Sequence, residues 1–84
     1  MKYDAVLGTL EGVRRAGSTG ATTQEAIRGN RRRRLGIEAT RKVLSALRVH
    51  GLVRRDAGRN LWIALPPGQH EEESLRQIVK ELTE

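Results

Sequence analysis

The residues best suited to chemistry in this chain are arginines, and the chemistry they suit is the binding of anions. Arg31, Arg32, Arg33 and Arg34 are adjacent in the sequence. Adjacent guanidinium groups repel one another, so a polyanion such as a nucleic-acid backbone would stabilise them. We interpret this run as a phosphate clamp; the alternative is a solvated loop that reflects a codon bias toward arginine.

Residues that carry catalytic or metal chemistry are few. The chain has no cysteine, which excludes disulfides and thiolate sites. His50 and His70 are separated in sequence and have no carboxylate at ligand spacing, so no metal is expected. Residues 71–73 are consecutive glutamates, which diverge around a helix and suit its first turn better than an acid–base pair. We therefore expect neither enzymatic activity nor a cofactor.

The chain is basic, and its charge is unevenly distributed. Its 84 residues carry a net charge of +6, and 13 of the 16 basic residues are arginine. Residues 1–68 contain 14 Lys/Arg and 5 Asp/Glu, whereas residues 69–84 contain 2 and 5. This length fits one small domain with a modest core. The first part is expected to meet an anionic partner, and the acidic end is expected to point away from it.

No apolar run approaches the roughly 20 residues that span a bilayer. The N-terminal residues also lack the long apolar core of a signal peptide. The sequence therefore predicts a protein of the cytoplasm, nucleus or nucleoid, without a membrane partner. In a prokaryote we expect it to be cytoplasmic and associated with the nucleoid.

Two helices are expected to flank the arginine run on its N-terminal side. Apolar residues at three- and four-residue spacing predict a first helix over residues 4–16. Thr22 and Glu25 have the spacing of a capping box, which predicts a second helix beginning directly after Thr22. That helix either stops at residues 29–30, leaving an arginine-rich loop, or continues through the arginines to Leu35.

A third helix is predicted over residues 37–50. Its inward stripe consists of Ile37, Thr40, Leu44 and Leu47, with Val43 beside it. Gly51 fits the left-handed position that follows a helix end. The helix therefore follows the arginine run directly, with Gly36 as the break.

A hairpin is predicted after this helix. Strands at residues 52–55 and 61–65 flank a turn rich in Gly, Asp and Asn. Residues 21–22 are expected to add a very short strand to it. Trp62, in the second strand, is expected to pack in the core and not to stack on bases, because the chain has too few aromatic residues for a stacking surface.

The order of these elements and the segment LGIEATRKVLSALRVHGLVRR resemble the winged helix-turn-helix family of nucleic-acid-binding domains. The leucines at positions 44 and 47 and the Gly51-Leu52-Val53 exit carry the likeness, which covers about residues 4–65. It implies an α+β, mostly α, fold of three helices and a β-hairpin wing within residues 1–67. Residues 68–84 then form a linker and an additional C-terminal helix. The extra residues from 29 to 34 depart from the tight turn that many family members keep.

The resemblance also implies a binding site, because most members place the third helix in the DNA major groove. On this resemblance, the residues of that helix expected to contact the major groove or the phosphates are Glu38, Arg41, Lys42, Ser45 and Arg48. The hairpin contributes Arg54, Arg55 and Arg59. Because Arg54 and Arg55 are adjacent in a strand, alternation directs only one of them toward the nucleic acid. The alternative is an ordinary charged outer helix face, with Arg41 or Lys42 paired with Glu38.

The last helix, over about residues 71–82, has a narrow apolar stripe. The stripe consists of Leu75, Ile78, Val79 and Leu82. A helix this short must pack on something to be stable in water. It either folds back on its own domain or pairs with the same helix of a second copy. We favour a homodimer, because a two-fold dimer doubles a short DNA site.

Together these features predict a non-enzymatic protein that binds duplex DNA, either a transcription regulator or a nucleoid-type architectural protein. The third helix would enter the major groove, and the arginine-rich loop and the wing would lie on the phosphate backbone. One alternative is an RNA-binding protein associated with ribosomes or RNA processing. The other is a winged-helix protein–protein adaptor. No small-molecule substrate is evident.

Overall fold

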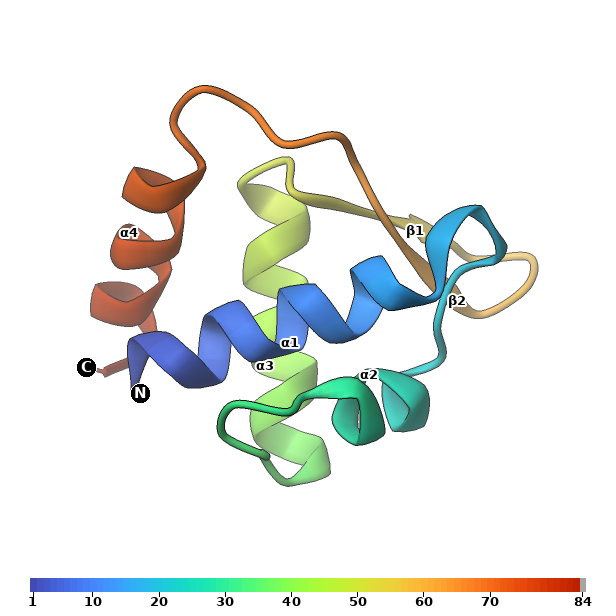
Figure 1. The fold of residues 1–84 in the computed structure, drawn as a ribbon, viewed down its shortest axis with the longest axis horizontal. Helices are drawn as coiled ribbons and strands as arrows, with labels where there is room; N and C mark the ends of the chain where they lie inside the picture. The colour runs from blue at the N-terminus through green and yellow to red at the C-terminus, as the bar shows by residue number, and fades with distance from the viewer. Residues whose placement is uncertain (84) are drawn as a thin grey trace.

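Helices dominate the structure, which is a computed structural model that describes residues 1–83. It is an α+β fold in which the described residues form four α-helices and one two-stranded antiparallel sheet (Figure 1). A short 3-10 turn at Gly17–Thr19 follows the first helix. The elements are α1 (Tyr3–Arg15), α2 (Thr23–Gly29), α3 (Ile37–Val49), β1 (Val53–Asp56), β2 (Leu61–Ala64) and α4 (Glu71–Thr83).

Helix α1 lies across α3 and contributes to the centre of the core (Figure 1). Val6, Leu10 and Val13 lie on its inner face and are fully buried. Asp4 in the first turn and Arg14 and Arg15 in the last turn complement the helix dipole. The predicted first helix is therefore confirmed within one residue at each end.

Helix α2 takes the shorter of the two predicted forms and ends at Gly29. Its capping box is confirmed: the Glu25 amide donates to Thr22 Oγ1 at 3.1 Å, and the Thr22 amide donates to Glu25 Oε1 at 2.9 Å. Gly12 and Gly29 let α1 and α2 approach closely. A Cβ atom on Gly29 would lie 2.8 Å from the Cα atom of Gly12, so this pair of helices requires glycine at the contact.

Helix α3 buries the expected stripe except at its first residue. Thr40, Val43, Leu44 and Leu47 are buried, but Ile37 is 36% exposed. Ile37 was predicted to face inward; because it is the first residue of α3, it lies at the end of the helix where the core no longer covers it.

Helix α3 ends in the conformation that Gly51 predicts. Gly51 has a φ of 77°. Its amide donates to the Arg48 carbonyl at 3.0 Å, and the Leu52 amide donates to the Leu47 carbonyl at 2.9 Å. These are the two hydrogen bonds of a Schellman motif, which direct the chain into the hairpin.

The hairpin pairs β1 with β2, with Arg55 opposite Trp62. Ala21 adds the expected short strand: its amide donates to the Trp62 carbonyl at 2.8 Å, and the Trp62 amide donates to the Ala21 carbonyl at 2.7 Å. Strand β1 starts one residue later than predicted and includes Asp56. The hairpin is thereby joined to the segment that leads into α2.

Helix α4 packs on α1 and α3, at the left of Figure 1. Leu75 and Ile78 are 1% and 0% exposed and belong to the single core of the domain, and Val79 and Leu82 are partly buried against that core. This corrects the assignment of the stripe to a homodimer contact. One chain already covers it, because the linker after β2 is long enough for the helix to fold back.

Polar contacts also hold α4 in place. Arg14 of α1 forms an ion pair with Glu71 in the first turn of α4. His50 Nε2, at the end of α3, lies 3.2 Å from Glu81 Oε1. Residues 68–83 are thus part of the same folded unit as the residues before them. Across residues 1–83, none of the helices combines the length and the apolar character that crossing a membrane requires.

Candidate nucleic-acid interface

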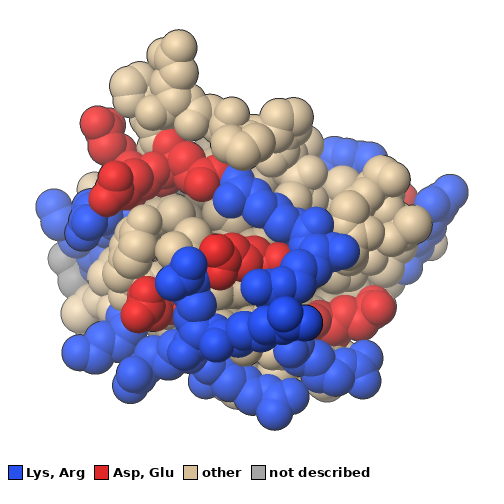
Figure 2. Space-filling model, in the orientation of Figure 1, with Lys and Arg blue, Asp and Glu red and all other residues tan. Residues whose placement is uncertain are grey.

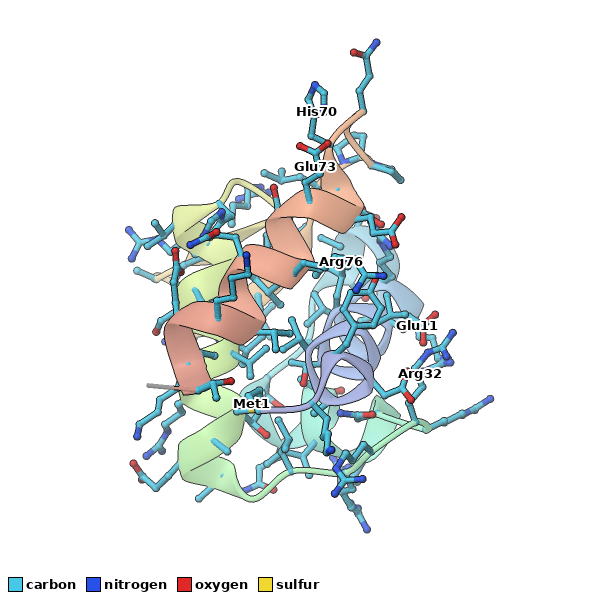
Figure 3. The ribbon with its side chains drawn as sticks, turned by 90° about the vertical axis from the view of Figure 1, so that its left-hand side faces the viewer. Met1, Glu11, Arg32, His70, Glu73 and Arg76 are labelled. Atoms are coloured by element: carbon cyan, nitrogen blue, oxygen red, sulfur yellow. The ribbon has the colours of Figure 1, made fainter. Side chains whose placement is uncertain are left out.

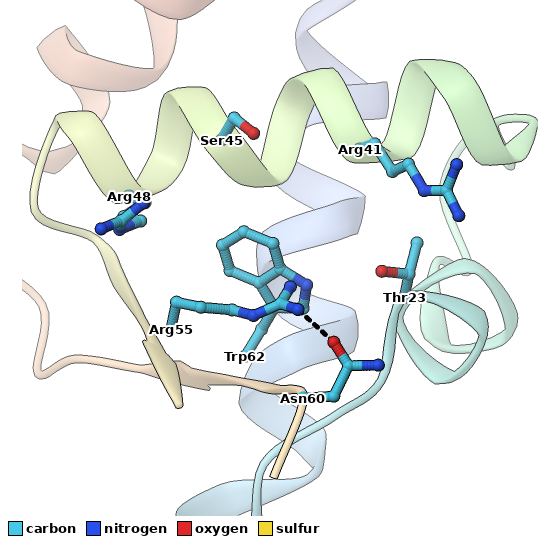
Figure 4. Close-up of a pocket in the computed structure, with 7 residues that line it drawn as sticks. All are labelled: Thr23, Arg41, Ser45, Arg48, Arg55, Asn60 and Trp62. Carbon is cyan, nitrogen blue, oxygen red and sulfur yellow. Dashed lines mark hydrogen bonds between the residues drawn. The ribbon is translucent and has the colours of Figure 1, made fainter. Parts of the chain in front are cut away.

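A groove lies between the outer face of α3 and the hairpin, with the start of α2 at one end (Figure 4). Its volume is about 430 Å³. We call it the hairpin groove, and its lining residues are Thr23, Arg41, Ser45, Arg48, Arg55, Asn60 and Trp62. Three of these carry positive charge and none carries negative charge, so the groove is suited to an anionic ligand.

Helix α3 contributes Arg41, Ser45 and Arg48, which follow one another at four- and three-residue spacing along one face. All three are exposed. The other two predicted α3 contacts, Glu38 and Lys42, are exposed but do not line the groove. Three of the five candidate residues on this helix are therefore brought together.

Glu38 has a local role in this arrangement. Its Oε1 atom accepts a hydrogen bond from Arg41 Nη1 at 3.3 Å, which is the intrahelical pairing that the sequence left open. The two side chains are 79% and 60% exposed. Such exposed pairs contribute little to stability, so Glu38 holds the Arg41 side chain only weakly.

The hairpin contributes Arg55, and not Arg54, to the groove. The two residues follow one another in β1, so their side chains lie on opposite faces, as strand alternation predicts. Arg55 lies over the ring of Trp62, with its Cζ atom 4.7 Å from the ring centroid. It also donates a hydrogen bond to Asn60 Oδ1 (Figure 4). Both contacts hold the guanidinium group at the groove.

Arg59 lies in the turn of the hairpin, away from the groove lining. Its amide donates to Asp56 Oδ1 at 3.2 Å, and its Nε atom is 3.8 Å from Asp56 Oδ2. The Arg59 side chain is 74% exposed. It is free to reach a surface beyond the hairpin tip.

Trp62 belongs to both the core and the groove. It is 6% exposed, which confirms that it packs inside. One edge nevertheless lines the groove, and its buried Nε1 atom has no hydrogen-bond partner within residues 1–83. Thr23, Asn60 and Trp62 were not predicted as site residues, because the groove exists only where three segments distant in sequence meet.

Asn30, which no sequence pattern distinguishes as a site residue, organises the arginine-rich loop. Asn30 is 7% exposed and lies against α1. Its Nδ2 atom is 2.9 Å from the Arg33 carbonyl oxygen, 3.3 Å from the Ala5 carbonyl oxygen and 3.4 Å from Thr9 Oγ1. Its Oδ1 atom accepts from the amides of Arg32 and Arg33, both at 3.1 Å. One buried amide thus fixes the path of the loop.

Arg32 points toward α1 and not toward α3 (Figure 3). Its Nε atom donates to Glu11 Oε1 at 2.6 Å, and its Nη1 atom lies 3.9 Å from Asp4 Oδ1. The hydrogen bond from Arg32 lowers the pKa of Glu11 and raises that of Arg32. The phosphate clamp stays a prediction, and Arg32 differs from the other three arginines of the run because carboxylates of α1 already pair with it.

The other three arginines of the run, Arg31, Arg33 and Arg34, are exposed and form no ion pair within residues 1–83. None of the four lines the hairpin groove. Figure 2 shows Lys and Arg side chains spread across the lower part of the face that carries α1 and α2, with carboxylates among them. The loop thus forms a second basic region, separate from the groove lining.

The described residues contain no group of three or more His, Cys, Asp or Glu side chains placed to hold a metal ion. Comparisons of this chain with protein-family models, with curated proteins and with solved structures find no match.

Proposed function

We propose that this protein binds duplex DNA in the manner of a winged helix-turn-helix domain, with α3 in the major groove and the hairpin as the wing. The observation that carries the proposal is the hairpin groove, where the outer face of α3 and β1 bring three arginines together without a carboxylate. The order of three helices followed by a hairpin supports it.

The dimensions of α3 suit this role. Its 13 residues give a rod of roughly 20 Å, and the major groove of B-DNA admits one α-helix. Arg41 and Arg48 lie about two turns apart on its exposed face, with Ser45 between them. Arginine recognises the O6 and N7 atoms of guanine with two hydrogen bonds, and serine contacts either a base or the backbone.

A phosphate backbone strand separates each major groove from the neighbouring minor groove. With α3 in the major groove and the hairpin beside it, that strand would pass between them, along the hairpin groove. Arg55 would then bind its phosphates, and Arg59 at the hairpin tip would reach the minor groove or the next phosphates. The arginines of the loop that remain unpaired, Arg31, Arg33 and Arg34, would add contacts to the flanking backbone.

The proposal includes a role as a transcription regulator or as an architectural protein of the nucleoid. A fluorescence-anisotropy titration with a random 20-base-pair duplex, repeated at three salt concentrations, tests it. Counterion release predicts a slope of about −0.9 in log K against log salt for each phosphate neutralised, so Arg55 and the three unpaired loop arginines together give roughly −3.6. An absence of binding at low salt would overturn the proposal.

The same titration distinguishes DNA from RNA when an RNA hairpin of equal length competes with the labelled duplex. We expect the duplex to be retained, because the deep, narrow major groove of A-form RNA does not admit a helix such as α3. Displacement by a smaller amount of RNA than of unlabelled duplex DNA would contradict the proposal and favour RNA binding.

A further inference from the structure

The indole N–H group of Trp62 is an unusual feature of the hairpin groove. Trp62 is only 6% exposed, yet its buried Nε1 atom has no partner among the described residues. Tryptophan can only donate at this atom, and buried donors in native proteins are almost always paired. An orphan donor at the edge of a groove is therefore a place where a ligand that accepts a hydrogen bond would gain affinity.

The surroundings of this atom determine the charge of such a ligand. The five-membered ring of Trp62 lies on the side of the groove toward Thr23 and Asn60 (Figure 4). The groove adds the hydroxyl groups of Thr23 and Ser45 and the guanidinium groups of three arginines, and it has no carboxylate. A ligand that fits this set carries negative charge and several acceptor oxygens, as a phosphate does.

We propose that the hairpin groove is a phosphate-binding site in which Arg55 and Trp62 Nε1 donate to the same phosphate group. Arg55 is already placed over the indole ring, 4.7 Å from its centroid. Because the Nε1 atom is buried, the N–H reaches a phosphate bound by this guanidinium group only when the Arg55 side chain shifts on the indole ring. The inference deepens the proposed function, because it takes the phosphate to come from the DNA backbone strand between α3 and the hairpin.

The chain contains its own probe for this site. Trp62 is the only tryptophan, so fluorescence excited selectively at tryptophan, and not at Tyr3, reports on the groove. The intact protein is titrated with a 20-base-pair DNA duplex, with adenosine monophosphate and with inorganic phosphate, each against sodium chloride of equal ionic strength. We expect a saturable change in Trp62 emission with the duplex at low salt, and a weaker change of the same sign with inorganic phosphate that chloride does not produce.

Replacement of Trp62 by β-(3-benzothienyl)alanine tests the hydrogen bond directly. This analogue keeps the bicyclic shape and replaces the N–H group by sulfur, so the packing of the core is retained. We expect the labelled duplex to bind roughly ten- to a hundredfold more weakly, the effect of one hydrogen bond to a charged acceptor. Equal affinity of the analogue and the natural protein would overturn the proposal.

A matched pair of variants tests the role of the guanidinium group. Arg55→Gln and Arg54→Gln each remove one positive charge from β1, but only Arg55 lines the groove. We expect Arg55→Gln to abolish the emission change with inorganic phosphate and Arg54→Gln to keep it. Equal responses of the two variants would contradict the site.

The outcomes separate this site from the proposed function. If the duplex does not bind but inorganic phosphate or the mononucleotide changes Trp62 emission with Arg55 dependence, the phosphate site stands and the DNA proposal fails. If the duplex binds without any change in Trp62 emission and without dependence on Arg55, the DNA proposal stands and the phosphate site is wrong.

Discussion

Asn30 connects the sequence of the arginine-rich loop to its shape. The run of four arginines would repel itself in an open loop, but the buried Asn30 side chain binds the Arg32 and Arg33 amides and anchors the chain on α1. Gly8 leaves the space that Asn30 fills, since a Cβ atom there would lie 2.0 Å from Asn30 Oδ1. One polar residue and one glycine thus determine where a charged segment lies.

Gly8→Ala is expected to lower the free energy of unfolding. Alanine gains about 1 kcal/mol over glycine in a helix interior, so helix propensity alone predicts stabilisation. The clash with Asn30 opposes it, and the displaced amide loses buried hydrogen bonds that contribute about 1–3 kcal/mol. We expect a net loss of up to about 2 kcal/mol, which urea denaturation measures.

The Asn30→Ala background provides the control for this prediction. Once the Asn30 side chain is removed, the added methyl group has room, so Gly8→Ala should cost less there than in the natural sequence. Additive effects of the two substitutions would show that Asn30 is not the cause of the loss.

Glu11 gives the stability a pH dependence with a defined sign. Arg32 lowers the pKa of Glu11 in the folded state below its usual value of 4.5. A carboxylate with a depressed pKa stabilises the fold above the unfolded-state value and loses that contribution as the pH falls through the folded-state value. The difference in unfolding free energy between the natural protein and Glu11→Gln should therefore shrink as the pH drops below 4.5. A difference that is constant between neutral and acidic pH would contradict this account.

At the scale of elements, local signals predicted the helices and the hairpin well. The capping box of Thr22 and Glu25, the glycine after α3 and the alternation of β1 act within a few residues, so the sequence alone reveals them. The prediction that the apolar stripe of α4 contacts a second copy was wrong, because an apolar stripe does not specify its partner. The same stripe of Leu75 and Ile78 fits a second copy or the space between α1 and α3, and only the assembled fold decides.

The packing of α4 predicts a specific stability effect. Ile78→Ala removes a fully buried side chain from the shared core and should cost about 2–5 kcal/mol of unfolding free energy. Gln77→Ala, at an exposed position of the same helix, should change it by no more than about 0.5 kcal/mol. Thermal and urea denaturation measure both. Similar small effects would show that α4 does not belong to the core.

The candidate site was only partly predictable, because its two sides come from segments that are distant in sequence. Helical spacing placed Arg41, Ser45 and Arg48 on one face, and alternation separated Arg54 from Arg55. The opposite edge of the groove depends on contacts across the fold, so Trp62 was predicted as a core residue alone. Charge counting also could not reveal that Arg32 is paired with α1.

At the scale of the whole molecule, positive charge occupies two separate regions. One is the hairpin groove, with Arg41, Arg48 and Arg55. The other is the arginine-rich loop, where three of the four exposed arginines form no ion pair within residues 1–83. The acidic residues 71–73 lie in the first turn of α4. Net charge alone would attract DNA to either basic region, whereas the proposed function requires that the groove, and not total charge, determines binding.

Two triple variants of equal charge test this claim most directly. One changes Arg41, Arg48 and Arg55 to Gln, and the other changes Arg31, Arg33 and Arg34 to Gln. Fluorescence anisotropy with the same labelled duplex measures the affinity of each at several salt concentrations. The proposed function predicts that the groove variant loses at least about tenfold more affinity than the loop variant. Equal losses, or a greater loss in the loop variant, would contradict it.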